Sequence, residues 1–219
     1  MKYGQIAGNK RINAIIYRCF EYLYEQDERK FVKKFREHSS DNDQIMHTFR
    51  ELVLGAYLSS NGFEVRHELS VGTKTPDWCI LSENSALRCI IELTNFHADK
   101  VTENEIEEQL QARAIALVWP GQNDNRLYQC IWRKSQVYKA LVEEYKVPYV
   151  IAVFGEFRAA IDWEEELNPC LFDEESGLFG LYPAVSGVLY FEENSKEFLF
   201  NYVDNPNSLK RIELPHGIF

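Results

Sequence analysis

The hydrophobic period of the sequence changes from that of a helix to that of a strand at Asn61-Gly62. Before this point, apolar residues recur every three or four positions over residues 45–56, which is typical of an amphipathic helix. After it, Phe63, Val65 and His67 alternate with charged residues, which is typical of a half-buried strand. Because Asn and Gly favour the end of a helix, the sequence predicts an α/β fold in which helix and strand meet at this dipeptide.

Two more strands are predicted over residues 75–81 and 87–93, joined by a polar turn at 82–86, so that the three strands form an antiparallel meander. A helix is predicted over residues 126–145, and Val147-Pro148 ends it. The apolar run 149–154 that follows is typical of a strand buried on both faces. The other expected elements are a helical hairpin or one bent helix at 10–38, helices at 102–118 and 162–168, loops at 121–125 and Asn168-Pro169, and strands at 187–191 and 198–203.

No linker or internal repeat divides the chain, so we expect one domain over residues 1–219. It comprises an N-terminal helical extension (1–40), a core (41–155) and a C-terminal extension of sheet and helix (156–219). The aromatic strands of the last part suggest either an extension of the sheet or the surface of a homodimer.

Composition limits the partners of the chain. No apolar stretch approaches the roughly 20 residues that cross a bilayer, and the first residues lack a hydrophobic signal segment, so we expect a cytoplasmic protein with no membrane partner. Five cysteines without CxxC spacing indicate neither a disulfide framework nor a zinc site. The net charge of −10 opposes nucleic-acid binding, yet basic runs occur at 29–36 and 126–139. These runs either steer phosphates or are solvated helix faces.

A pair of carboxylates is the main candidate for chemistry. If the hairpin turn centres on residues 84 and 85, paired positions sum to 169, and Asp77 lies opposite Glu92. Two carboxylates at that separation favour a divalent cation between them, and Mg²⁺ takes such ligands. The backbone carbonyl of Leu93 is a further expected ligand. In the alternative interpretation Asp77 is a turn residue, and Glu92 pairs with a nearby arginine, Arg88 or Arg66.

The order of these segments resembles that of the PD-(D/E)xK superfamily of restriction-endonuclease-like proteins. A helix bearing Glu51, the segment Gly62–Val65, Pro76-Asp77 and Ile91–Thr94 are followed by helix and buried strand, over residues 41–155. The resemblance implies a mixed central β-sheet flanked by helices. It also implies that Asp77 and Glu92 bind Mg²⁺ or Mn²⁺.

Thr94 departs from the family pattern, because the family places a lysine there that stabilises charge during phosphodiester hydrolysis. On a wheel of 100° per residue, Lys134 falls on the apolar face of the helix predicted at 126–145, and Lys139 falls at its margin. A lysine that has moved to this helix is similar to what several branches of the superfamily show. We therefore predict that Lys134, or else Lys139, supplies the cation; the alternative is a lysine that extends from a core helix to solvent.

Two other residues are lesser candidates. Glu51 flanks the apolar face of its helix, and the resemblance implies that it reaches the metal through water; a solvent-facing glutamate is the equal alternative. His97 follows the strand that carries Glu92, where a surface histidine is the more common interpretation.

Three functions follow as hypotheses. The first is an Mg²⁺-dependent endonuclease acting on DNA, in which Asp77 and Glu92 hold the metal, Lys134 replaces the strand lysine and water attacks. The second is a catalytically degenerate protein of the same fold that binds protein or nucleic acid. The third is a small acidic partner protein of a larger defence or repair system.

Overall fold

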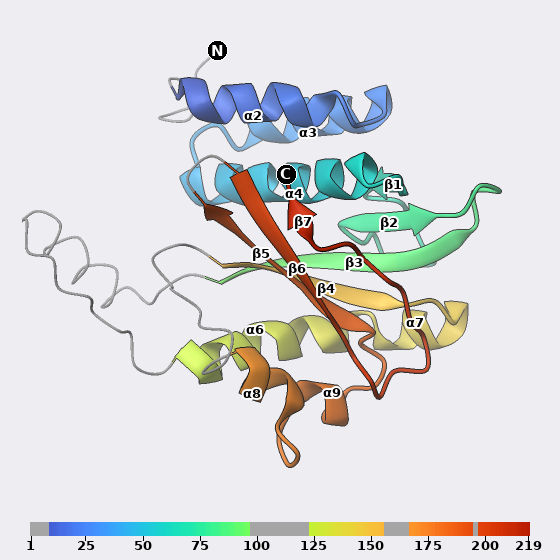
Figure 1. The fold of residues 1–219 in the computed structure, drawn as a ribbon. Coiled ribbons are helices and arrows are strands. Elements are labelled where there is room, and N and C mark those ends of the chain that lie inside the picture. The colour runs from blue at the N-terminus through green and yellow to red at the C-terminus, as the bar shows by residue number, and fades with distance from the viewer. Residues whose placement is uncertain (1–8, 97–122, 156–166, 195–196) are drawn as a thin grey trace, which may run out of the picture. The chain divides into compact units, whose positions relative to one another are not determined.

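A computed structural model describes residues 9–96, 123–155, 167–194 and 197–219 (Figure 1). The chain divides into two compact units, Met1–Ile91 and Glu92–Phe219. Each contains helices and β-strands, so the predicted α/β class is confirmed. The expectation of a single domain concerns how the units associate, and it stays a prediction.

Three helices form one side of the first unit. They are α2 (Lys10–Phe20), α3 (Glu25–Glu37) and α4 (Asn42–Ser60), so the N-terminal segment is a pair of helices and not one bent helix. Figure 1 shows α2 and α3 lying against α4. Asn9 and Asp41 begin α2 and α4 by accepting hydrogen bonds from backbone N–H groups of the first turn, which have no partner within the helix.

Two short strands, β1 (Glu64–His67) and β2 (Trp78–Leu81), pair antiparallel, and β2 pairs antiparallel with β3 (Leu87–Phe96). Trp78 lies opposite Ile91, so the predicted register, in which paired numbers sum to 169, is confirmed at this pair. After Ile80 the register shifts by one residue, so that Leu81 pairs with Leu87.

Trp78 is the centre of the first unit's core. Its side chain is fully buried, and its indole N–H donates to the backbone oxygen of Glu51 at 2.9 Å. Gly55 makes room for the ring, because a Cβ atom on Gly55 would lie 1.9 Å from Trp78. This close approach fixes the face of α4 that covers the hairpin.

The second unit contains a mixed sheet. Strand β4 (Tyr149–Gly155) runs parallel to β5 (Gly187–Asn194), which pairs antiparallel with β6 (Glu197–Asp204), and β6 pairs with β7 (Gly217–Ile218). Every residue of β4 is buried, which confirms the prediction of a strand covered on both faces.

Helix α6 (Asn123–Val137) packs against β4, and α7 (Lys139–Tyr145) continues from it (Figure 1). The prediction of one helix over 126–145 is wrong, because the backbone leaves helical geometry at Tyr138. The buried ring of Tyr138 packs on Tyr149, with 5.7 Å between the ring centroids. The helix therefore breaks where Tyr138 makes a tertiary contact, and no Gly or Pro marks the break in the sequence.

The second unit also contains two short helices, α8 (Asn168–Phe172) and α9 (Leu178–Leu181). The loop predicted at Asn168-Pro169 is wrong, because these residues begin α8, where proline lacks only an N–H that would have no helical partner. The predicted loop at 121–125 is likewise wrong from residue 123, where α6 begins.

The helix predicted at 102–118 lies outside the described residues, as do all but the last two residues of the helix predicted at 162–168. Among the helices that the structure describes, none has the length and apolar character needed to cross a membrane.

Candidate functional site

Glu92 and Lys134 form an ion pair inside the second unit. The Lys134 ammonium lies 2.8 Å from Oε2 of Glu92 and donates a hydrogen bond to it. Glu92 is on β3 and only 4% exposed, whereas the Lys134 side chain, from the last turn of α6, is 28% exposed. A buried carboxylate requires such a partner, because burial of an unanswered charge is costly.

The position of Lys134 follows from the helix that carries it. Leu127 and Ile131, on the same side of α6, are fully buried, as the helical wheel predicts. The Tyr149 hydroxyl donates to the backbone oxygen of Lys134 at 2.7 Å, which ties the end of α6 to the start of β4. Core packing therefore holds the lysine on the side of the helix that faces Glu92.

The other predicted residues of this site lie in different surroundings. Lys139 is exposed at the start of α7, so of the two lysine candidates the structure brings Lys134 to Glu92. Asp77 is half-buried, directly before β2, and its backbone oxygen accepts a hydrogen bond from Glu68. Leu93 is fully buried on β3. The expected metal contacts of Asp77, Glu92 and the Leu93 carbonyl stay predictions.

Glu51 occupies a separate charged cluster in the first unit. It is 2% exposed, so the solvent-facing alternative is wrong. Its Oε2 atom lies 2.9 Å from the Lys34 ammonium and 3.4 Å from Nε2 of His67, and its Oε1 atom lies 3.1 Å from Nε2 of His47. Lys34 also contacts Glu68 at 2.8 Å. We call these five residues the Glu51 cluster.

His67 joins the Glu51 cluster to the aromatic core. Its fully buried ring lies 4.2 Å from the ring of Phe31 and 5.0 Å from that of Trp78, measured between centroids. The Lys30 ammonium donates to the backbone oxygen of His67. Side chain and backbone of His67 are therefore both held by α3, which fixes the imidazole beside Glu51.

The Glu51 cluster favours the charged forms of Glu51 and Lys34. Burial alone would raise the pKa of Glu51, but hydrogen bonds from His47 and His67 and the charge of Lys34 lower it well below its usual value. Burial acts to lower the pKa of Lys34, and Glu51 and Glu68 raise it above its usual value. At neutral pH the pair is therefore a carboxylate and an ammonium.

Asp77 is expected to point away from Glu51, because the two residues are associated with opposite faces of the hairpin. Trp78 points toward α4, as its hydrogen bond to Glu51 shows. Because successive residues of a strand point to opposite faces, Asp77 is expected to point away from α4. The Glu51 cluster thus belongs to the covered face of the hairpin.

The sequence did not predict Lys34, His47 and His67 as partners of Glu51, or Glu68 as a partner of Lys34. Two signals were present: His47 precedes Glu51 by four residues on one helix, and His67 shares the inward face of β1 with Val65. Lys34 gave no signal, because it comes from another helix.

The first basic run is largely neutralised within its own unit. On α3, Arg29 pairs with Glu25, Lys33 with Glu37 at 3.7 Å, and Lys34 with the Glu51 cluster. Surface pairs of this kind are weak, but they reduce the net charge that the run presents to a phosphate backbone. The hypothesis that this run steers nucleic acid gains no support from its surroundings.

His97 lies outside the described residues. Among the residues that are described, no group of three or more His, Cys, Asp and Glu side chains is arranged to hold a metal ion. The predicted Mg²⁺ site needs only two carboxylates, so this result does not decide it.

Comparison of the chain with protein-family models, with curated proteins and with solved structures finds no match in any of the three. The resemblance to the PD-(D/E)xK superfamily therefore depends on the order of the short motifs in this chain and on the surroundings of their residues.

Proposed function

We propose that the protein is a metal-dependent nuclease that hydrolyses phosphodiester bonds of DNA, with the active site at Asp77, Glu92 and Lys134. The observation that carries the proposal is the 2.8 Å ion pair between Glu92 and Lys134. It places a helix lysine on the strand carboxylate that the superfamily pattern pairs with a strand lysine, and Thr94 occupies that strand position here.

The register of the hairpin supports the inclusion of Asp77. Trp78 pairs with Ile91, and the proposal extends this register by one step, which would make Asp77 the partner of Glu92. Side chains of such a pair share a face of the sheet. Strand alternation would give both acids the face opposite to that of Trp78 and Ile91.

The donor set suits Mg²⁺ or Mn²⁺, because both are hard cations that prefer carboxylate oxygens. When bound, the metal would stabilise developing negative charge and activate a water molecule. Asp77 and Glu92 would hold it, with the Leu93 carbonyl as a further oxygen ligand. Lys134 would hold Glu92 in place and stabilise the charge that develops on the phosphate.

Glu51 has a supporting role in this proposal. Three donors already surround its carboxylate, and Trp78 ties its backbone to the hairpin. The Glu51 cluster therefore has a structural role, because it stabilises the hairpin that carries Asp77. The resemblance instead implies that Glu51 contacts the metal through water.

Cleavage of labelled single- and double-stranded DNA, with RNA as a comparison, tests the activity. With Mg²⁺ or Mn²⁺ we expect cleavage by the wild type and a loss of about 100-fold or more in Asp77→Ala, Glu92→Gln and Lys134→Met. Glu83→Gln, in the exposed turn of the same hairpin, is the matched control. If Lys139→Met loses activity and Lys134→Met keeps it, the lysine assignment is wrong.

Thermal unfolding tests the metal site independently of turnover. Mg²⁺ or Mn²⁺ should raise the Tm of the wild type and leave that of Asp77→Ala unchanged, because a ligand that binds the native state stabilises it. Equal responses of the two proteins would contradict metal binding by Asp77.

The second candidate is a catalytically degenerate binding module of the same fold. Thr94 at the lysine position and the net charge of −10 favour it. It predicts no cleavage and no effect of metal on the Tm. If such a protein binds DNA, log affinity should fall linearly with log salt, and a flat dependence would remove the nucleic-acid partner.

A further inference from the structure

The second unit contains an open pocket of about 380 Å³ that the proposed activity does not use. Apolar side chains line it, among them Val142 from α7, Leu181 from α9 and Leu209 from the segment after β6. Leu181 is 49% exposed and Leu209 is 95% exposed. Apolar side chains this exposed at the edge of a pocket are typical of a surface that a partner covers.

Three lysines surround the same pocket. Lys139, Lys146 and Lys210 line it and are exposed, and Glu143 is the acidic side chain among the lining residues. Within the described part of the chain, none of the three ammonium groups forms an ion pair. In a chain of net charge −10, this concentration of unpaired cations on an apolar surface indicates an anionic partner with an apolar side chain.

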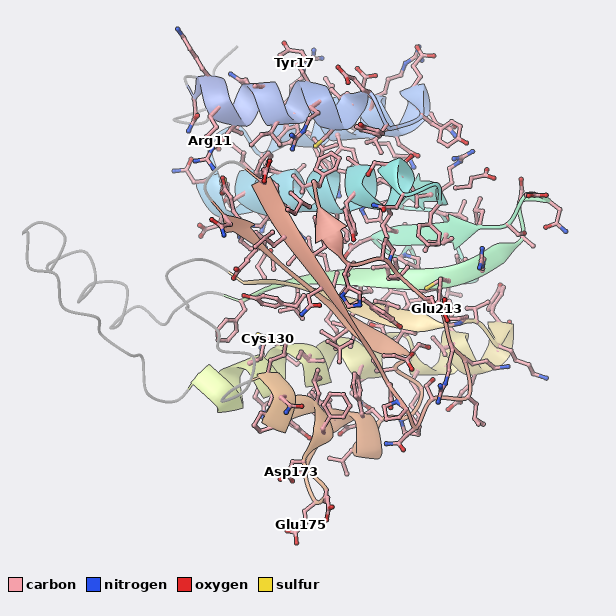
Figure 2. All side chains as sticks on the ribbon, in the orientation of Figure 1. Arg11, Tyr17, Cys130, Asp173, Glu175 and Glu213 are labelled. Atoms are coloured by element: carbon pink, nitrogen blue, oxygen red, sulfur yellow. The ribbon has the colours of Figure 1, made fainter. Side chains whose placement is uncertain are left out.

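The chain itself presents such a group. Phe172, the last residue of α8, is 41% exposed, and the turn between α8 and α9 that follows it carries Asp173, Glu174 and Glu175. Figure 2 shows Asp173 and Glu175 at the end of this projecting turn. We call Phe172–Ser176 the acidic turn.

The acidic turn is ordered before any partner binds. Oδ1 of Asp173 accepts hydrogen bonds from the backbone N–H of Glu175 at 3.1 Å and from the backbone N–H and hydroxyl of Ser176, both at 2.8 Å. These hydrogen bonds lower the pKa of Asp173. Asp173 thus shapes the turn, and Glu174 and Glu175 remain exposed for a partner. Binding then costs little loop entropy.

We propose that the partner is a second copy of this chain, with the acidic turn of each copy docked on the lysine-lined pocket of the other. Helix α9 directly follows the turn and contributes Leu181 to the pocket, so both features lie close together in one unit. A two-fold arrangement therefore engages both contacts at once. Glu174 and Glu175 meet the lysines, while Phe172 meets the apolar lining.

The expected dimer is weak and sensitive to salt. The contact consists of two short turns and two small pockets, so we expect an interface at the low end of the specific size range and an affinity of about micromolar. The rim charges are exposed, so salt should screen them. Sedimentation velocity on the full chain from about 5 to 500 μM should show dimer at low salt and an affinity at least about 10-fold weaker in 0.5 M NaCl.

A charge exchange makes the test specific. The pocket variant carries Lys146→Glu and Lys210→Glu, and the turn variant carries Glu174→Lys and Glu175→Lys. Each variant alone should be monomeric, because its pocket and turn then have like charges. Mixed in equal amounts, the two should form a heterodimer, because every turn then meets a pocket of opposite charge. All four positions are exposed, so folding should be unaffected.

The control variant carries Lys10→Glu and Lys33→Glu, two exposed positions in the first unit with the same change in net charge as the pocket variant. It should dimerise like the wild type. A wild type that stays monomeric at 500 μM overturns the proposal. So do variants that dimerise unchanged, or a mixture that stays monomeric. If a short DNA binds the pocket of a monomeric wild type, and the pocket variant does not bind it, the occupant is nucleic acid.

Discussion

Two buried glutamates in this protein have different surroundings. Glu51 in the first unit has both carboxylate oxygens engaged by Lys34, His47 and His67, which come from three elements. Glu92 in the second unit has Oε2 engaged by Lys134. Both are almost fully buried, so burial does not distinguish them. Glu51 is held by donors from α3, α4 and β1 within the core of the first unit, whereas the partner of Glu92 is a lysine that is 28% exposed.

The largest expected effect is the loss of the Glu51 carboxylate. Glu51→Ala should lower the free energy of unfolding by about 3–5 kcal/mol, because the fully buried His67 and the partly buried Lys34 and His47 lose their shared acceptor. Urea denaturation measures this. Glu25→Ala, an exposed glutamate paired with Arg29, is the control and should cost no more than about 0.5 kcal/mol. Equal effects would show that the Glu51 cluster is not a stabilising network.

Removal of the cation beside Glu92 should have the next largest effect. Lys134→Met should cost about 2–3 kcal/mol, near the low end for a broken buried pair because the lysine is partly exposed. In a double-mutant cycle, adding Glu92→Gln should restore part of this loss, since no buried charge then lacks its cation. Additive losses in urea denaturation would contradict the coupling.

A substitution that changes no charge tests the contribution of packing in the core near Glu51. Gly55→Ala should cost about 1–3 kcal/mol through overpacking, because the new methyl would overlap the buried ring of Trp78. Gly180→Ala in α9 is the matched control, since a Cβ there meets no atom within 4 Å. Its Tm should stay the same or rise slightly. A tolerated Gly55→Ala would mean that Trp78 moves freely.

The smallest expected effect is the change in the free energy of unfolding at low pH. The folded protein holds the pKa of Glu51 below its unfolded value, so this stabilisation is present above about pH 4.3 and is lost as the pH falls toward the folded pKa. Wild type should exceed Glu51→Gln by about 1–2 kcal/mol at pH 7. The gap should shrink below about pH 4. A constant gap down to pH 3 would contradict the shift. Lys34 contributes nothing to this window, because its raised pKa matters only in base.

Local signals were enough to predict much of the fold. The register of the hairpin followed from its polar turn, and the start of the buried strand followed from Val147-Pro148. The buried face of α6, which carries Lys134, followed from helical periodicity. Whether the acids and the lysine act together stays a prediction, because the sequence pattern specifies their order and not their chemistry.

The features that could not be predicted depend on contacts distant in sequence. Lys34 reaches Glu51 from another helix, 17 residues earlier in the chain. The break at Tyr138 accompanies its packing on Tyr149, which has no local sequence signal. The loop predicted at Asn168-Pro169 was wrong, because proline is compatible with both a loop and the first turn of a helix.

The boundary between the two compact units falls between Ile91 and Glu92, inside the continuous strand β3. If the two units open independently, amide hydrogens on either side of this peptide bond belong to different cooperative units. In that case native-state exchange of residues 87–91 should follow opening of the first unit, and exchange of residues 92–96 should follow opening of the second. One short peptide in a mass-spectrometry experiment would show whether the chain opens in one step or in two.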